Sequence, residues 1–241
     1  MVDEMPPTIS LVAPCLNEQD NVIPLASRFL ERAKVLGVRS EIVFVDDGST
    51  DNTVGNIALL QHEWRESVQL ISHAKNEGIP AAWRSGVVAA RGSLVCLIDA
   101  DLQNRPESVF DLLDAYDEQE AGIVQGVRIQ TNRKLSRFLM SKALNLVLNL
   151  TFRMKSSDNK SGFILCRTSD LRRILNYKGS YRHFQTFIGV AAVHHGLKII
   201  EVKTPFDDRR SGQSFLTGRS WKVSLEVLRD FRVARAEFSK R

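Results

Sequence analysis

The chain has 241 residues, 43% of them hydrophobic and 25% charged, a balance typical of a globular protein with a substantial core. It contains no run of about 18 uncharged apolar residues, so we expect no transmembrane helix, and residues 1–7 lack the basic start of a signal peptide. The net charge of +5 favours anionic partners. Because no basic recognition motif with interleaved aromatic residues accompanies that charge, we expect no nucleic-acid partner.

Buried strands alternate with helices in the first half of the chain. Apolar runs predict strands over residues 8–14, 41–45, 68–72, 94–98 and 122–126. Helical patterns lie between them over residues 21–36 and 78–90, and a further helix ends near Trp64. Strands that alternate with helices of this length form βαβ units, so we predict the α/β class with a Rossmann-like, mostly parallel sheet flanked by helices.

The pattern changes after Arg128. We predict helices over residues 135–152, 170–175 and 181–196, strands over 161–166 and 198–202, and a polar loop over 207–218. No linker is visible, so residues 1–218 are expected to form one domain. Residues 219–241 would add a basic amphipathic helix that either lies on anionic lipid or packs on the domain. Spacing alone leaves the helix over 135–152 open as a core element, a dimer face or a lipid groove.

Residues 94–103 carry the clearest chemistry. An apolar run ends at two carboxylates, Asp99 and Asp101, and Gln103 follows. In extended backbone alternate residues point the same way, so all three side chains could reach one hard cation, Mg²⁺ or Mn²⁺. The alternative is that the carboxylates only cap the next helix. Their place at the end of a buried strand, where ligands bind in open α/β sheets, favours a metal site.

A second pair of acids, Asp46 and Asp47, follows the strand over residues 41–45. Both pairs would lie on the same rim of a parallel sheet. Carboxylates there accept hydrogen bonds from ribose hydroxyls and base N–H groups, which predicts a nucleotide site.

Six segments together resemble the inverting family 2 glycosyltransferases of the GT-A fold. The resemblance is to the branch of dolichol-phosphate mannose synthase and the bacterial polyprenyl-phosphate glycosyltransferases, in its soluble type without transmembrane helices. The segments are Ala13–Glu18, Val45–Asp51, Asp99–Glu107, Gly126–Arg128, Asp158–Phe163 and Arg209–Ser214. They occur in a consistent order across about residues 8 to 225, so together they are more specific than any one motif.

The resemblance implies roles for individual residues. The residues expected to bind the nucleotide are Pro14, Asn17, Glu18, Asp46, Asp47, Lys75 and Asp99. The expected metal ligands are Asp99, Asp101 and Gln103. The expected catalytic residues are Asp101, Asp158, Arg128 and Arg209, and the acceptor phosphate would contact Arg137, Arg209 and Ser214. Two points stay open: which of Asp46 and Asp47 holds the base or ribose, and whether Arg137 contacts phosphate or only solvent.

The resemblance implies a metal-dependent transfer of a hexose from a UDP- or GDP-hexose to a polyprenyl phosphate. If the acceptor is instead a sugar or small-molecule hydroxyl, Asp158 is the candidate base. A lipid phosphate needs none, because its second pKa is about 6. A non-catalytic nucleotide-sugar or lipid-binding subunit is a third reading, against which the intact metal motif argues.

Two departures from that branch concern the acceptor. Phe215 stands where a lysine is usual, and Ile79-Pro80 follows Gly78 where leucine and glycine are usual. We expect the protein in the cytoplasm, peripheral on the cytoplasmic membrane face through lipid contact or a membrane-protein partner. Three cysteines, an odd number, fit reduced buried thiols in that compartment.

Overall fold

The structure is a computed structural model that describes residues 8–119, 121–129, 135–208 and 220–239. Of residues 135–140 and 220–225 only the backbone is described. The expected loop over residues 207–218 therefore falls almost wholly outside the described residues, and Arg209 and Ser214 fall with it.

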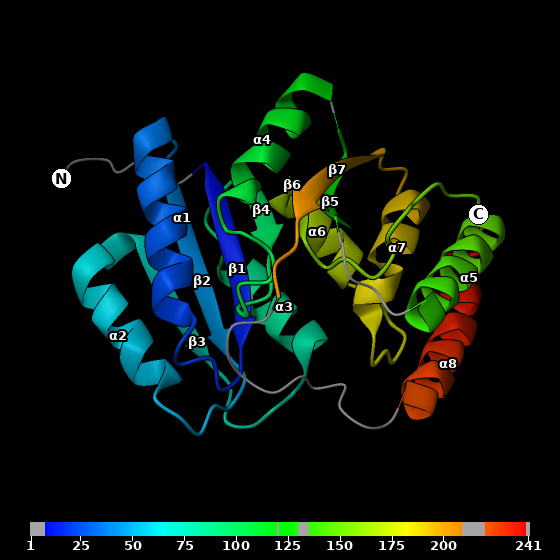
Figure 1. Ribbon diagram of the computed structural model, residues 1–241, viewed down its shortest axis with the longest axis horizontal. Helices are drawn as coiled ribbons and strands as arrows, with labels where there is room; N and C mark the ends of the chain where they lie inside the picture. Colours follow the sequence, from blue (N-terminus) through cyan, green and yellow to red (C-terminus); the bar gives the residue numbers. More distant parts are fainter. Residues whose placement is uncertain (1–7, 120, 130–134, 209–219, 240–241) are drawn as a thin grey trace.

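A seven-stranded sheet with the order β3-β2-β1-β4-β6-β5-β7 forms the centre of the molecule (Figure 1). Its strands are β1 (Ile9–Cys15), β2 (Ser40–Asp46), β3 (Val68–Ser72), β4 (Leu94–Leu97), β5 (Ile123–Ile129), β6 (Ile164–Arg167) and β7 (Ile199–Pro205). β3, β2, β1 and β4 are parallel, β6 runs antiparallel to both β4 and β5, and β5 is parallel to β7. The predicted α/β class and mostly parallel sheet are confirmed.

Helices cover both faces of the sheet. One core packs under α1 (Val22–Leu36), α2 (Thr53–Trp64) and α4 (Ser108–Gln119). The other packs under α3 (Ile79–Ala89), α5 (Leu135–Phe152), α6 (Thr168–Leu175), α7 (Ile188–His194) and α8 (Ser220–Phe238). Strand residues alternate between the two cores, as Leu11 and Val12 do in β1, because successive side chains of a strand point to opposite faces. Short 3₁₀ helices span Arg65–Ser67 and Phe184–Phe187.

The helix expected over residues 181–196 is wrong in extent. The chain instead forms the 3₁₀ helix Phe184–Phe187 and then α7. The reason lies in α8, where Asp230 accepts hydrogen bonds from the backbone N–H groups of Arg182 and His183. Those N–H groups are thereby held by a distant carboxylate, and residues 181–183 stay outside any helix.

The C-terminal helix α8 packs on the domain through its inner face, where Ala234 and Phe238 are buried in the second core. The division at residue 218 remains a prediction. In the part of the chain that the structure describes, no helix has both the length and the apolar character needed to cross a membrane. The three cysteines are buried and unbridged, as expected, and burial raises the pKa of the Cys96 thiol well above its usual value.

Candidate active site at the carboxyl ends of the strands

Most of the residues expected to bind the sugar nucleotide lie at or just after the ends of three strands, β1, β2 and β4. Cys15 at the end of β1 pairs with Asp46 at the end of β2, and the N–H of Asp47 donates to the Cys15 carbonyl. Leu97 at the end of β4 pairs with Val12, so Asp99 follows just past the paired residues on the other side of β1. The central strand β1 thus has the two acidic strand ends on its two sides.

The loop after β1 is tied to the loop after β2. Asn17 adopts a left-handed conformation (φ +56°), which asparagine tolerates better than most residues. Its N–H donates to the Ser49 hydroxyl at 2.9 Å, and its side-chain oxygen accepts the N–H of Thr50 at 2.8 Å. Glu18 is buried, and its N–H donates to the Thr53 hydroxyl. In this structure Asn17 and Glu18 organise the walls of the candidate nucleotide site.

Asp46 and Asp47 are both buried but have different environments. Asp46 accepts the N–H of Ser49 at 3.2 Å. Asp47 accepts the N–H groups of Glu77 at 2.9 Å and Gly78 at 2.8 Å. Asp47 therefore holds the loop after β3, which carries the exposed Lys75, against the end of β2.

His73 was not among the predicted site residues, yet it lies in the same loop after β3 and contacts the Asp47 carboxylate. Its Nδ1 lies 2.8 Å from the Asp47 carboxylate and its Nε2 lies 2.9 Å from the Ser85 hydroxyl of α3. Gly48 lies so close to this loop that an added Cβ would come 3.0 Å from the Lys75 carbonyl carbon. One cue was available, because His73 directly follows a strand that was predicted to end on the same rim.

The extended geometry expected for Asp99, Asp101 and Gln103 is wrong. β4 ends at Leu97, and a turn follows in which Leu102 has a φ of +61°. The turn is closed by the Asp101 carboxylate, which accepts the N–H of Gln103 at 3.1 Å. Asp101 is buried and Asp99 exposed. Within the described ranges, no three His, Cys, Asp or Glu side chains gather closely enough to hold a metal ion.

The turn after β4 is joined to the end of β7. Asn104 forms an isolated bridge with Phe206, and the N–H of Asp207 donates to the Gln103 carbonyl at 2.8 Å. Gln103 also turns its amide toward Asp207, where Nε2 donates to the backbone carbonyl at 3.3 Å. Arg105 binds the Asp207 carboxylate with two nitrogens, at 2.8 and 2.9 Å, and this raises the pKa of the guanidinium.

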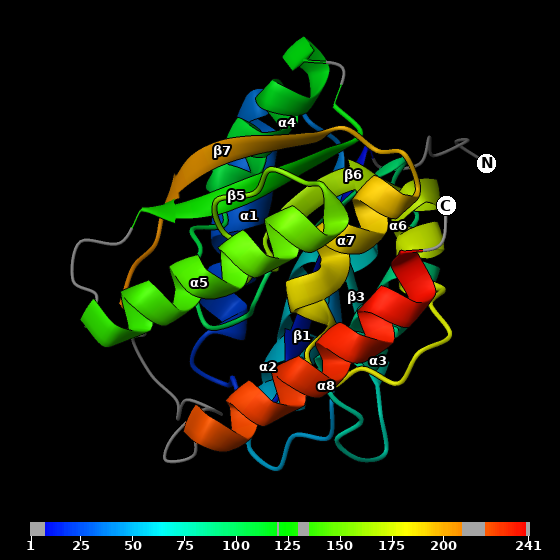
Figure 2. The same cartoon turned by 90° about the vertical axis from the view of Figure 1, so that its right-hand side faces the viewer.

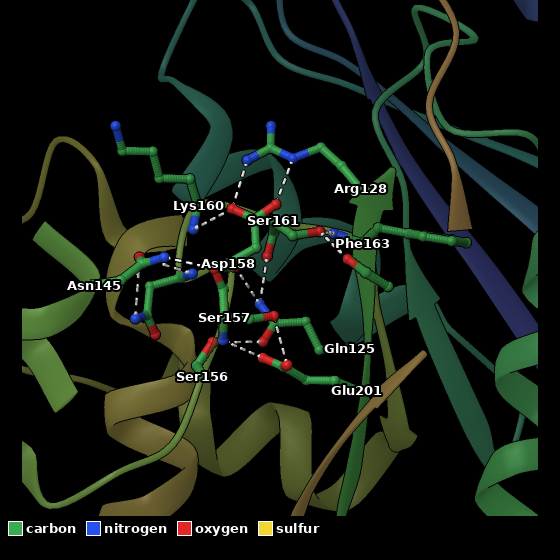
Figure 3. A network of polar contacts seen from close by, with 12 residues as sticks. Gln125, Arg128, Asn145, Ser156, Ser157, Asp158, Lys160, Ser161, Phe163 and Glu201 are labelled. Carbon is green, nitrogen blue, oxygen red and sulfur yellow. Dashed lines mark hydrogen bonds and ion pairs between the residues drawn. The ribbon is translucent and has the colours of Figure 1, made fainter. Parts of the chain in front are cut away.

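Arg128 and Asp158 form a two-point ion pair next to this junction (Figure 3). Nε and Nη2 of Arg128 donate to the two carboxylate oxygens at 2.7 Å each, and the N–H of Lys160 donates to Oδ1 of Asp158 at 3.3 Å. Only 7% of the Asp158 side chain and 18% of the Arg128 side chain are exposed. The guanidinium also lies over the ring of Phe206, 5.3 Å from its centroid. Phe206 therefore links the candidate phosphate site to the candidate metal turn.

The segment before β6 is held on three sides, as Figure 3 shows. Gln125 of β5 donates to the carbonyls of Asp158 and Ser161, at 3.1 Å each. Asn145 of α5 donates to the Ser157 carbonyl, and Glu201 of β7 accepts the Ser157 N–H, both at 2.6 Å. The backbone around Asp158 is thereby fixed before any ligand arrives.

Close packing explains two of the sequence motifs. The N–H of Gly126 donates to the Phe163 carbonyl at 2.8 Å, and the Ser161 hydroxyl donates to the Gly126 carbonyl at 2.6 Å. A Cβ on residue 126 would overlap the ring of Phe163. Gly126 of the segment Gly126–Arg128 thus leaves the space that the ring of Phe163, in the segment Asp158–Phe163, occupies.

The remaining predicted residues are placed as follows. Pro14 pairs with Val45 inside the sheet, and the Asp51 carboxylate accepts the N–H of Thr53, the first residue of α2. The backbone of Arg137 lies in α5, and its side chain is outside the description. The roles assigned to individual site residues remain predictions.

Known proteins resemble the chain along most of its length. Residues 10–178 match the family "Glycosyl transferase family 2". A dodecaprenyl-phosphate galacturonate synthase of Rhizobium johnstonii is 28% identical over 91% of this chain. An undecaprenyl-phosphate 4-deoxy-4-formamido-L-arabinose transferase of Pectobacterium carotovorum is 28% identical over 89%. The matched regions cover 65% and 64% of these relatives, so the chain spans less than two thirds of their length.

Solved structures share the fold at low sequence identity. A mannosyltransferase from Pyrobaculum calidifontis in complex with GDP-Man and Mn²⁺ aligns with a TM-score of 0.66 at 15% identity, over 97% of this chain and 66% of that chain. Glucosyl-3-phosphoglycerate synthase from Mycobacterium tuberculosis, in complex with Mn²⁺, UDP and phosphoglyceric acid, aligns with a TM-score of 0.63 at 20% identity, over 86% and 72%. With the family match covering residues 10–178, the chain belongs to glycosyl transferase family 2.

Proposed function

We propose that this protein is a metal-dependent, inverting glycosyltransferase that moves a hexose from a UDP- or GDP-hexose to a polyprenyl phosphate. The family membership and the two relatives, which are named as polyprenyl-phosphate sugar transferases or synthases, support the reaction class. The sugar, the nucleotide and the acceptor of this chain are all part of the proposal.

Asp99 and Asp101 would hold a divalent cation on the diphosphate of the donor. Their carboxylate oxygens are the hard ligands that Mg²⁺ and Mn²⁺ prefer, and Asp101 is already oriented by the N–H of Gln103. Two carboxylates leave positions for water and phosphate oxygens, as is usual for Mg²⁺ bound with nucleotides. When bound, the cation would offset charge on the leaving diphosphate. In this structure the amide nitrogen of Gln103 is occupied by Asp207, so a ligand role for Gln103 would use its Oε1 atom.

The base and ribose would lie between the loops after β1, β2 and β3. We assign the direct contact to Asp46, because the carboxylate of Asp47 already accepts two backbone N–H groups and contacts His73. Asp47 and His73 would act by positioning the loop that carries Lys75. That lysine is exposed and could reach a phosphate oxygen of the donor.

The two-point pairing of Arg128 with Asp158 is the observation that carries the choice of acceptor. Both oxygens of Asp158 accept a charge-assisted hydrogen bond from Arg128, and Oδ1 also accepts the N–H of Lys160, so few acceptor positions are left for a substrate hydroxyl. A phosphate acceptor is already ionised near neutral pH and needs no base. In Figure 3, Nη1 of Arg128 points away from Asp158, which leaves the guanidinium one side from which to contact an anion.

The competing reading keeps Asp158 as general base for a hydroxyl acceptor. In that case the acceptor hydroxyl has to reach a carboxylate whose two oxygens already accept three hydrogen bonds. A polyprenyl acceptor is anchored in a bilayer, so in our proposal the protein works peripherally on the cytoplasmic membrane face, by direct lipid contact or through a membrane-protein partner.

Nucleotide binding tests the donor half of the proposal. Purified protein is titrated calorimetrically with UDP and with GDP, each with and without Mn²⁺, and then incubated with a panel of UDP- and GDP-sugars. We expect metal-dependent binding of one nucleotide, which Asp101→Asn abolishes. The exposed Asp117 of α4 supplies the matched control, Asp117→Asn, which should bind like the wild type. If the protein neither binds nor hydrolyses any of these nucleotides, the proposed function is withdrawn.

A further inference from the structure

Helix α5 presents an apolar row to solvent. Ala143, Leu146, Val147 and Leu150 follow the i, i+3, i+4, i+7 spacing of one helix face, and all four are exposed. The exposed fractions are 59% for Leu146, 47% for Val147 and 72% for Leu150. Sequence spacing left this helix open between core, dimer face and lipid groove; the outward row shows that this face is not core.

The inner face of α5 is the more polar one. Asn145 donates to the Ser157 carbonyl, and Asn149 donates to the Ser156 carbonyl at 2.9 Å. Leu148 and Phe152 lie in the second core, and Leu144 packs against it. A helix on the surface of a soluble protein normally points its apolar side inward and its polar side outward. From Ser141 onward α5 departs from that pattern, which indicates that its outer face meets something other than water.

Helix α8 extends the same side of the molecule. Figure 2 looks onto this side, where α5 and α8 both lie toward the viewer with α7 between them, and both helices lie together at one end of the molecule in Figure 1. The rings of Phe152 and Phe231 meet edge to face at 5.9 Å, so the helices touch near the end of α5. The outward side chains of α8 include Leu228, Arg229, Arg232 and Arg235. One plane could therefore meet the outer faces of both helices.

Among the side chains that the structure describes, the exposed charged residues of α5 and α8 are all basic. α5 contains no acidic residue, and exposed basic residues border its apolar row: Lys142, Arg153 and Lys155. The three acids of α8 are engaged by other residues: Glu226 by Arg182 and His183, Asp230 by backbone N–H groups, and Glu237 by Tyr181. The pKa of Glu226 is held below its usual value by its hydrogen bond to His183 and by Arg182. The exposed side chains that the structure describes on α5 and α8 are therefore apolar or basic.

We propose that the outer faces of α5 and α8 form a docking surface for an anionic lipid bilayer. Leu146 and Leu150 enter the boundary between head groups and acyl chains, and the arginines of α8 with Lys142, Arg153 and Lys155 meet the anionic head groups. The inference extends the proposed function, because it brings the segment that carries Asp158, which the inner face of α5 holds, close to a membrane-bound acceptor. A second copy of the chain or a protein partner would need no such uniform basic charge.

Vesicle binding tests the surface without any sugar nucleotide or acceptor. The full chain is mixed with vesicles of phosphatidylcholine, alone or with phosphatidylglycerol, and the bound fraction is measured by flotation at two salt concentrations. We expect binding only to the anionic vesicles, weakened by salt because screening reduces the electrostatic attraction. The double variant Leu146→Glu/Leu150→Glu should bind at least about tenfold more weakly, since it removes two leucines that the bilayer would bury.

The matched control is Leu59→Glu on α2, at the other end of the molecule in Figure 1. Leu59 is 64% exposed, close to Leu146 at 59% and Leu150 at 72%, so Leu59→Glu matches the change in charge and apolar area of Leu146→Glu or Leu150→Glu alone, and these single variants are measured beside it. This control should bind vesicles like the wild type, and unchanged UDP or GDP binding by the double variant shows that it folds. Arg229→Glu/Arg232→Glu should remove the preference for anionic vesicles.

Three results would overturn the docking surface. One is wild-type protein that binds neither kind of vesicle, and another is a double variant that binds as well as Leu59→Glu. The third is a wild-type dimer in size-exclusion chromatography that Leu150→Glu dissociates, which would assign the face to a second copy. None of these measurements depends on sugar transfer, so they can disprove the docking surface without disproving the proposed function, and the reverse also holds.

Discussion

Arg128 of β5 and Asp158 of the segment before β6 are joined by two hydrogen bonds of 2.7 Å, and both side chains are largely buried. The pair is further fixed by Phe206 on one side and by the N–H of Lys160 on the other. In our proposal Asp158 is therefore a positioning residue for Arg128. The proposed phosphate acceptor and the alternative hydroxyl acceptor give this pair different roles, which the first prediction tests.

Replacement of Asp158 by asparagine should weaken transfer without abolishing it. The amide side chain keeps one acceptor for Arg128 but loses the charge, so we expect a higher KM for prenyl phosphate and a loss of turnover below about 10²-fold, the lower bound for removal of a general base. In wild type and Asp158→Asn alike, the rate should rise through about pH 6 as the acceptor phosphate loses its second proton. Initial rates across pH measure both. A loss of about 10⁴-fold, or a pH step absent from the variant alone, would identify Asp158 as the base.

Asp47→Ala should lower stability and nucleotide affinity together. It removes the acceptor of the Glu77 and Gly78 N–H groups and the partner of His73, at a cost of about 1–2 kcal/mol because water can reach part of this loop. Chemical denaturation and calorimetric titration of UDP and GDP measure the two effects. His73→Ala should show a smaller loss of both, and the double variant should be less than additive, since the two side chains share one contact. Loss of binding with unchanged stability would instead mean that Asp47 touches the nucleotide.

Gly126→Ala should destabilise the protein by about 1–3 kcal/mol, because the added methyl group overlaps the ring of Phe163. The free energy of unfolding from urea titration measures this. Adding Phe163→Leu should recover part of the loss, since a smaller side chain makes room for the methyl group. A single variant as stable as the wild type would show that the glycine is not required for packing.

Glu41 should contribute stability that depends on pH. Burial alone would raise its pKa, but donors on Ser10, Arg91 and Gln69 outweigh burial and hold the pKa below its usual value of 4.5. A depressed pKa in the folded state means that the stabilisation is present above about pH 4.5 and is lost as the pH falls through the lower, folded value. Glu41→Gln should cost about 2 kcal/mol at pH 7, and the difference from wild type should shrink below pH 4.5. A pH-independent difference would contradict this.

Local patterns predicted the strands, their acidic ends and the sheet class, because apolar runs and strand ends depend on neighbouring residues. Long-range contacts decided the rest. The turn at Asp99–Gln103 depends on Leu102 in a left-handed conformation and on the Asp101 carboxylate, and Asp230 of α8 shortened the helix expected from residue 181.

The side chains that contact Asp47 and Asp158 could not be predicted from the sequence either. Asp47 and Asp158 each follow or precede a strand as expected. Asp47 contacts His73, 26 positions away in the sequence, and Asp158 binds Arg128, 30 positions away. Phe206 contacts Arg128 and Asn104 because β5, the end of β7 and the turn after β4 come together in the fold. No local sequence pattern specifies that arrangement.

The most direct test of the account compares two acceptors that differ only in the phosphate. Purified protein with Mn²⁺ and a labelled sugar nucleotide is given a polyprenyl phosphate or the matching polyprenol, and labelled lipid is extracted and counted. We expect glycosylated lipid from the phosphate and none from the alcohol, with Asp101→Asn inactive on both. Product from the alcohol, or from neither acceptor with a nucleotide sugar that binds, would contradict it.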